Sequence, residues 1–214
     1  VEDIIEQLTN PEKTIGLYNV KNRLVSIAQT ISWRAGNVSV GRYIFHGPPG
    51  TGKTHMARQF CNLLFRLGII KRNYVYEVSA KQLCHPDPEI DYGLSGGREP
   101  TIMEIIEAAF EQAKGGIIFI DEAPQLLDTD LGESVLRALV PIIDRPDVYE
   151  NTCVILAGYT DEMTRLLNED DGLASRFPKG NRIRFDNYNA QDIAKLSEFF
   201  AKKQGHTVDA DFKE

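Results

Sequence analysis

Two neighbouring acids, Asp121 and Glu122, directly follow a run of four apolar residues, 117–120, in the stretch GGIIFIDEAPQLL. Burying an ionised carboxylate costs free energy unless a partner compensates its charge. A metal ion is one partner that would stabilise acids at the edge of a core. The alternative is a solvated strand end, at which both carboxylates face water. The acid pair therefore raises the question of which positive charge it faces.

A second stretch, GPPGTGKT, matches the phosphate-loop pattern G-x-x-x-x-G-K-[ST] without exception. It stands between a predicted strand and a predicted helix, which is the context that the pattern requires. Its glycines let successive backbone N–H groups point at phosphate oxygens, and the N-terminus of the next helix adds positive charge. A glycine-rich turn without a ligand is the alternative. The candidate nucleotide-binding residues are Gly47, Pro48, Pro49, Gly50, Thr51, Gly52, Lys53, Thr54 and His55.

The phosphate loop offers a partner for the acid pair. Lys53 would reach the β- and γ-phosphates of a nucleotide, and the Thr54 hydroxyl would ligate Mg²⁺. Asp121 would add negative charge beside the metal, through a bound water. Glu122 would orient and deprotonate the water that attacks the γ-phosphate. A glutamate at this position favours an ATPase with its own catalytic base, so the sequence predicts ATP and Mg²⁺ as ligands.

Short apolar strands alternate with amphipathic helices along the chain. This alternation indicates an α/β fold with a parallel sheet covered on both faces, whose ligands bind beyond the carboxyl ends of the strands. The expected strands are residues 42–47, 74–79, 116–121, 152–159 and 181–188. The expected helices are residues 52–69, 100–114, 133–144 and 189–204. Pro141 should kink or end the third helix, and Asn189 should cap the last one.

The order of the strands bears on the catalytic glutamate. One extra strand, residues 74–79, lies between the phosphate loop and the acid pair. We expect this arrangement to place the third strand beside the first, as in phosphate-loop enzymes that carry a catalytic glutamate.

The bulk composition is that of a globular protein with one large domain, or one domain and part of another. The 214 residues are 42% hydrophobic and 26% charged, with a net charge of −7 and no dense Lys/Arg cluster, which argues against a nucleic-acid backbone as the main ligand. No apolar run reaches the length of a membrane span, and no signal-peptide pattern is present. Cys61, Cys84 and Cys153 lack zinc-ligand spacing. We expect reduced thiols, in the cytoplasm or an organelle stroma.

Together, GPPGTGKT, IIFIDEA, VILAGYTDEMTRLL and GLASRF resemble the AAA+ ATPases. More narrowly, they resemble the CbbX/CfxQ group, which includes red-type Rubisco activases, SpoVK and the EccA ATPases of type VII secretion. The stretch IGLYNVKNRL is similar to the N-terminal base-binding segment of that group. The resemblance implies a three-layer P-loop NTPase sandwich of the ASCE branch, with a five-stranded parallel sheet, over residues 1–188. Residues 1–30 would form the helical, base-binding segment, and residues 189–214 would begin a helical lid.

The resemblance also implies roles for single residues near the nucleotide. Ile15, Gly16 and Leu17 would flank the adenine. Tyr159 falls at the first sensor position beside the γ-phosphate, where most of the superfamily has Asn. A tyrosine hydroxyl can also bond the attacking water or a phosphate oxygen. A half-buried core tyrosine is the alternative.

Arg176, in SRF, matches the arginine finger of the family. It would reach the nucleotide of a neighbouring subunit and neutralise charge that develops in the transition state. The alternative is a surface arginine paired with Asp170 or Asp171. Arg165 and Arg182 are weaker candidates for the finger.

An aromatic-glycine loop in the family lines a central pore and grips a polypeptide. Tyr92 and Gly93, in CHPDPEIDYGLSGGREP, are the best match. The loop is longer than in the family, and three acids precede the tyrosine. It is therefore a pore loop, a reader of basic segments or a plain surface loop. No sensor-two arginine of the lid can be assigned.

The leading functional hypothesis is an ATP-driven ring, a hexamer in the full-length parent, that remodels or translocates a protein client. The first rival is a nucleic-acid motor or clamp loader, against which the acidic charge and the lack of a basic groove argue. The second rival is a nucleotide-gated scaffold that binds ATP without turnover. Glu122 and Arg176 argue against that scaffold.

Overall fold

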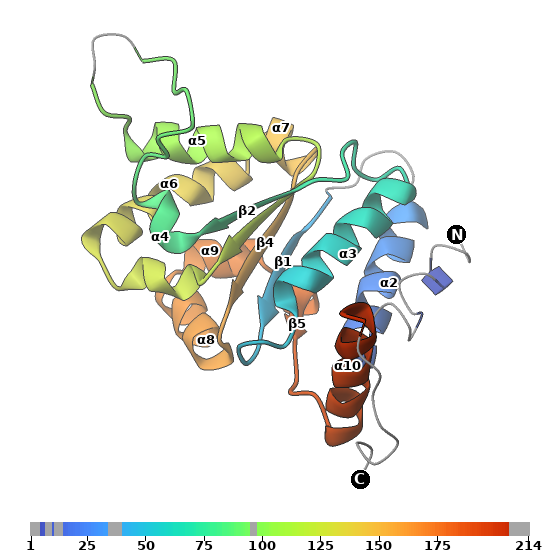
Figure 1. Cartoon of the computed structure of the whole chain (residues 1–214). Coiled ribbons are helices and arrows are strands. Elements are labelled where there is room, and N and C mark those ends of the chain that lie inside the picture. Colours follow the sequence, from blue (N-terminus) through green and yellow to red (C-terminus); the bar gives the residue numbers. More distant parts are fainter. Residues whose placement is uncertain (1–4, 7–9, 11–14, 34–39, 95–97, 206–214) are drawn as a thin grey trace.

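A five-stranded parallel sheet forms the centre of the molecule (Figure 1). The structure is a computed structural model and describes residues 5–6, 10, 15–33, 40–94 and 98–205. The strands are β1 (Arg42–His46), β2 (Val75–Ser79), β3 (Ile117–Asp121), β4 (Cys153–Gly158) and β5 (Arg182–Arg184). Their order is β2-β3-β4-β1-β5, and all neighbours run parallel. The predicted α/β class and five-stranded parallel sheet are confirmed.

The expectation that the third strand lies beside the first is wrong, because β4 separates them. Leu156 of β4 pairs with Ile44 of β1 on one side and with Ile120 of β3 on the other. Every residue of β4 is buried, whereas β2 carries the exposed Glu77 and forms an edge of the sheet. A strand that is apolar on both faces suits a position with neighbours on both sides.

Helices cover both faces of the sheet and complete three layers (Figure 1). One face carries α2 (Tyr18–Trp33) and α3 (Lys53–Arg66). The other carries α4 (Ala80–Leu83), α5 (Ile102–Ala113), η1 (Ala123–Leu127), α6 (Asp130–Ile143), α8 (Thr160–Glu169) and α9 (Asp171–Arg176). The remaining elements are α7 (Pro146–Tyr149), η2 (Lys179–Asn181) and α10 (Ala190–Lys203).

Alternate strand residues build a separate core on each face. Ile118 packs in the core on the α5–α6 face, and its neighbour Phe119 packs in the core on the α2–α3 face. Val154 and Ile155 divide in the same way. This alternation explains why the strands are continuous apolar runs.

One detail of the helices differs from expectation and one agrees with it. Helix α6 continues through Pro141 to Ile143, because a proline in the last turn removes only one hydrogen bond of the helix. Asn189 caps α10 as predicted, and its side chain accepts a hydrogen bond of 2.8 Å from the Asp192 N–H. Residues 1–4, 7–9 and 11–14 of the predicted base-binding segment and residues 206–214 of the predicted lid lie outside the described residues.

The three cysteines are free thiols. Burial raises the pKa of Cys61 to about 11 and the pKa of Cys153 well above its ordinary value, so both stay protonated at neutral pH. In the part of the chain that the structure describes, no helix has the length and apolar character needed to cross a membrane.

Candidate functional site

The phosphate loop, residues 47–54, joins the end of β1 to the start of α3. Its backbone turns at Gly50 (φ 71°) and Gly52 (φ 87°), both in the left-handed region that favours glycine. The Thr51 hydroxyl donates a hydrogen bond of 2.8 Å to the Pro48 carbonyl oxygen. These features give the loop a tight curl.

Lys53 is turned back on its own loop. Its Nζ donates hydrogen bonds of 2.9 Å to the carbonyl oxygens of Gly47 and Pro48. Burial lowers the pKa of Lys53, and the charge of Asp121 opposes that shift. A partly buried ammonium group that faces acceptors is well placed to donate to phosphate oxygens instead.

A cavity of about 400 Å³ lies beside the loop, at the carboxyl ends of β1, β3 and β4. This volume is in the usual range of ligand pockets. The lining residues are Pro49, Gly50, Thr51, Gly52, Lys53, Thr54, His55, Asp121, Glu122, Gln125, Gly158, Tyr159 and Glu162. The structure thus brings the loop and the acid pair together, while Gly47 and Pro48 contribute the carbonyls that hold Lys53.

Glu122 has an unusual backbone conformation. Its φ of 53° and ψ of 33° lie in the left-handed region, which is uncommon for residues other than glycine. Its N–H donates a hydrogen bond of 2.9 Å to Asp121 Oδ1. Such conformations persist where the surroundings impose them, and they gather at functional sites. Here the buried Ala123 and Pro124 fix the chain just after the glutamate.

The donor groups of the cavity fit Mg²⁺. Thr54 offers a hydroxyl and Asp121 a carboxylate, and both line the same space. Mg²⁺ prefers oxygen ligands. Water molecules and phosphate oxygens usually supply most of them, so Mg²⁺ needs few protein ligands. No cluster of three or more His, Cys, Asp or Glu side chains able to hold a metal occurs among the described residues.

Tyr159 stands at the end of β4, as the N-cap of α8. It lines the cavity, is 43% exposed, and its ring centroid lies 5.6 Å from Lys53 Nζ. The following residue, Thr160, lies with its hydroxyl 3.2 Å from His46 Nδ1, which ties this end of β4 to β1. The Tyr159 side chain therefore faces the phosphate loop and is too exposed for a core tyrosine.

The predicted base-binding segment lies next to the loop. Gly16 and Leu17 both have left-handed backbones, with φ of 67° and 54°. A Cβ at Gly16 would come within 2.9 Å of the Tyr188 ring and the Asp192 carboxylate, so only glycine fits. The Tyr188 hydroxyl in turn donates a hydrogen bond of 3.4 Å to the Thr51 carbonyl oxygen.

A second cavity, of about 170 Å³, adjoins this segment. Its lining residues are Leu17, Tyr18, Asn19, Val20, Arg184, Asp186, Asn187, Tyr188 and Asp192. Sequence reasoning missed Tyr188 and Asp192. The available signal was an aromatic residue and an acid four positions apart at the start of a helix, which also suits a plain helix N-terminus.

The sequence of residues 43–185 matches the family described as "ATPase family associated with various cellular activities (AAA)". This chain belongs to the AAA family. The match spans the phosphate loop, the acid pair and four of the five strands in full, and ATP hydrolysis is the chemistry of the chain.

Relatives of this AAA module include a Rubisco activase, CfxQ homologs and EccA1 proteins, which confirms the resemblance to the CbbX/CfxQ group. The chain is 27% identical to the chloroplastic "Ribulose bisphosphate carboxylase/oxygenase activase" of Cyanidioschyzon merolae, over 97% of the chain and 69% of that protein. It is 28% identical to the "Protein CfxQ homolog" of Galdieria sulphuraria, over 97% and 67%. It is 33% identical to the "ESX-1 secretion system protein EccA1" of Mycobacterium tuberculosis, over 95% and 35%. The chain thus spans about a third of EccA1.

Among solved structures, the AAA domain of FIGL-1 in complex with ADP is similar to this chain. The TM-score is 0.59 at 20% identity, over 88% of this chain and 59% of that one. At this identity the likeness supports the fold alone.

Arg176, at the end of α9, does not line the cavity of its own AAA module. Its Nε and Nη2 contact the Asp144 carboxylate, and its Nη1 donates a hydrogen bond of 2.7 Å to the Gly172 carbonyl oxygen. The proposed alternative of a pair with Asp170 or Asp171 is wrong, because Asp144, the C-cap of α6, takes that place. The reason is that Asp170 caps α9 and is already bonded there.

The two weaker finger candidates are engaged elsewhere. Arg165 forms exposed ion pairs with Asp128 and Glu169. Arg182 donates a hydrogen bond of 3.0 Å to the Phe177 carbonyl oxygen.

Tyr92 and Gly93 lie in the loop between α4 and α5, whose described parts extend away from the sheet (Figure 1). The Tyr92 hydroxyl accepts a hydrogen bond of 2.8 Å from the Asp87 N–H. Gly93 has φ 66°, and its N–H donates a hydrogen bond of 2.8 Å to Asp91 Oδ1. The acids ahead of the tyrosine thus order the loop.

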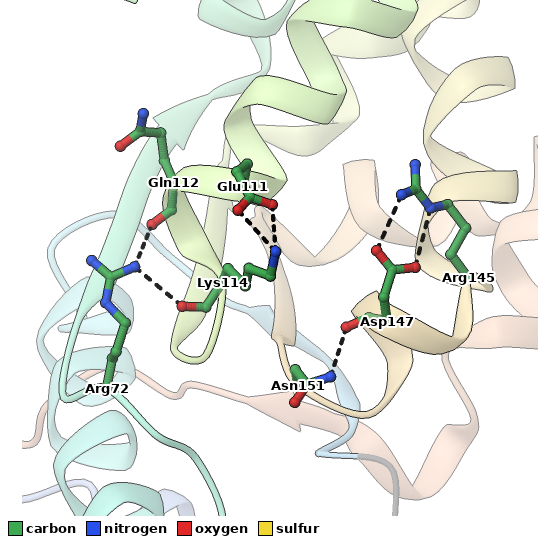
Figure 2. A network of polar contacts seen from close by, with 7 residues as sticks. All are labelled: Arg72, Glu111, Gln112, Lys114, Arg145, Asp147 and Asn151. Carbon is green, nitrogen blue, oxygen red and sulfur yellow. Dashed lines mark hydrogen bonds and ion pairs between the residues drawn. The ribbon is translucent and has the colours of Figure 1, made fainter.

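A third cavity, of about 340 Å³, lies between Tyr92 and the helices α5 and α7. Five acidic side chains line it, and basic partners neutralise four of them. Figure 2 shows two such pairs, Glu111 with Lys114 and Asp147 with Arg145. This cavity shares no lining residue with the one at the phosphate loop.

Proposed function

We propose that this chain is the ATP-hydrolysing module of a ring that remodels or translocates a protein client. One observation carries the proposal: residues 49–55, the acid pair and Tyr159 line one cavity at the carboxyl edge of the sheet. This is the edge at which parallel sheets bind ligands.

Five residues of the cavity have a chemical part in hydrolysis. Lys53 exchanges its two loop carbonyls for β- and γ-phosphate oxygens. Thr54 and Asp121 would hold Mg²⁺, which when bound neutralises phosphate charge. Glu122 accepts a proton from the attacking water. The Tyr159 hydroxyl orients that water or a phosphate oxygen.

The second cavity supports a place for the adenine. Leu17 and Tyr188 line it and also lie beside Gly52 of the phosphate loop. A nucleotide whose phosphates lie along the loop would extend its base toward this space. Ile15, Gly16 and Leu17 would flank that base.

An arginine from a neighbouring subunit completes the proposed site. None of the described residues that line the cavity is an arginine. Lys53 and a bound Mg²⁺ would supply positive charge within the cavity, and Arg176 does not line the cavity of its own subunit. Assembly of subunits into a ring, a hexamer in the parent protein, would bring Arg176 to the next nucleotide.

Protein is the favoured client, gripped by Tyr92 and Gly93 in a central pore. The net charge of −7 disfavours the nucleic-acid motor. Relatives named as a Rubisco activase and as a secretion-system protein support a protein client. The free thiols support the cytoplasm or an organelle stroma as its compartment.

Steady-state ATPase rates over a protein concentration series test this proposal. Arg176→Ala should keep ATP binding but lose turnover, and mixing it with Glu122→Gln subunits should restore part of the rate at hybrid interfaces. Absence of rescue on mixing would remove the support for a finger in trans. Stimulation of the ATPase by DNA would favour the motor instead, and ATP binding without measurable turnover would favour the scaffold. Unchanged turnover in Glu122→Gln would contradict the role of Glu122 as the base.

A further inference from the structure

We propose that Asp144 is a positioning residue for Arg176, which holds the guanidinium group in the orientation that meets the neighbouring nucleotide. The inference rests on the proposed trans role of Arg176. Asp144 is the C-cap of α6 and lies 32 residues before Arg176 in the sequence. The sequence resemblance assigns no role to this acid.

The contact between the two side chains is specific. Asp144 Oδ2 accepts a hydrogen bond of 2.7 Å from Arg176 Nε and also contacts Nη2 of the same guanidinium. The Gly172 carbonyl oxygen accepts from Nη1 at 2.7 Å, and Ser175 Oγ lies 3.4 Å from Nη1. Three sides of the guanidinium therefore have partners within the subunit.

Arg42 fixes Asp144 from the other side. Its Nη2 lies 2.9 Å from Asp144 Oδ1 and donates a hydrogen bond of 2.7 Å to the Ile143 carbonyl oxygen. Arg42 is the first residue of β1, and its side chain is only 12% exposed. The sheet thus fixes the backbone of Arg42, Arg42 contacts Asp144, and Asp144 contacts Arg176.

This chain of contacts leaves Arg176 available to a partner. A guanidinium group has five N–H donors, and a second N–H on Nη2 remains for a phosphate oxygen. The side chain is 26% exposed, so a partner can reach it. Fixing a long side chain in advance removes an entropic cost of forming the transition state, which is how preorganised charges accelerate a reaction.

The competing interpretation is a structural ion pair that only ties α6 to α9. Asp144→Asn separates the two interpretations, with Glu133→Gln as the matched control. Glu133 is also a carboxylate on α6 that pairs with an arginine, Arg137, at an exposed position. Both variants replace an acid by its amide. Glu133→Gln releases the exposed Arg137, whereas Asp144→Asn releases Arg176 and also the largely buried Arg42.

A positioning role predicts that Asp144→Asn lowers kcat about tenfold or more, while KM for ATP stays close to wild type. The melting temperature should fall only by what the weakened contact with Arg42 contributes, so that kcat falls much further than the loss of stability explains. Glu133→Gln should leave kcat unchanged. Mixing Asp144→Asn with Glu122→Gln should restore turnover, because the Glu122→Gln subunit supplies an intact finger to an intact glutamate. Loss of stability in step with kcat and no rescue on mixing would show a structural pair only.

A measurement without assembly completes the test. In the ¹H–¹⁵N spectrum of the free chain, Arg176 Nε–H should give a resolved signal that is absent in Arg176→Lys and averaged in Asp144→Asn. An averaged signal in the wild type would overturn the proposal. If Arg176→Ala abolishes turnover and Asp144→Asn does not, Asp144 has no positioning role. If Arg176→Ala keeps wild-type turnover, the trans finger itself fails, and the inference fails with it.

Discussion

Lys53 donates a hydrogen bond of 2.9 Å to the carbonyl oxygen of Gly47, the first residue of its own phosphate loop. The lysine therefore closes the loop on itself, with its ammonium group between backbone oxygens and the acid Asp121, whose charge acts on it. Binding of a triphosphate replaces neutral acceptors by anionic ones, so the gain in free energy comes from charge as well as from hydrogen bonds.

We predict that Lys53→Ala lowers the affinity for ATP about a hundredfold or more, since hydrogen bonds to charged groups contribute about 1.5–3 kcal/mol each. Isothermal calorimetry with ATP and Mg²⁺ measures the change. Lys114→Ala, which removes an exposed lysine paired with Glu111, is the control and should bind as the wild type does. Equal affinities of Lys53→Ala and wild type would contradict the assignment.

Short-range signals were enough to predict much of the site. The loop 47–54, the acid pair and the cap at Asn189 each follow from residues close together in the sequence, and the structure places them as expected. The features that were missed depend on long-range pairing. The position of β4 between β1 and β3, the partner of Arg176 and the contact of Tyr188 with Gly16 all join residues far apart in the chain. No local pattern specifies which strand or acid arrives there.

A second prediction concerns the acid pair. Glu122→Gln should bind ATP but lose turnover by about 10²–10⁴-fold, the usual contribution of a general base. Single-turnover hydrolysis and calorimetry measure the two effects separately. Glu162→Gln removes the same charge from the same cavity, but from α8. It should stay within about tenfold of wild type, because no general-base role is assigned to it. Equal losses in both variants would show that charge alone matters.

A third prediction concerns the base-binding segment. Gly16→Ala should weaken ATP binding and lower stability, because the new Cβ would come within 2.9 Å of Tyr188 and Asp192. Gly68→Ala is the matched control, since Gly68 has a similar φ of 70° but nothing within 4 Å of the Cβ position. The control should lose about 1–2 kcal/mol of stability from its backbone alone and keep its affinity for ATP. Thermal melts and calorimetry compare the two variants. Identical behaviour would mean that the packing over Gly16 is unimportant.

The fourth prediction concerns pH and His46, which stands just before the phosphate loop and faces Thr160. Burial lowers the pKa of His46, with further lowering from the charges of Arg184, Arg182 and Lys53, while Asp186 opposes them. The folded state therefore binds a proton on His46 less readily than the unfolded state does. The stabilisation is present above the unfolded pKa of about 6.5 and is lost as pH falls through the lower folded pKa.

Urea unfolding at pH 7.5 and at pH 5.0 tests this sign. The free energy of unfolding should fall between the two, and His46→Asn should reduce that fall because asparagine does not titrate. Other acid-sensitive groups contribute to the fall in both proteins, so the difference between them is the quantity to measure. The fall in His55→Asn measures the contribution of a second histidine, because burial and Arg58 also lower the pKa of His55. A fall as large in His46→Asn as in the wild type would show that His46 does not link the stability of this edge of the sheet to pH.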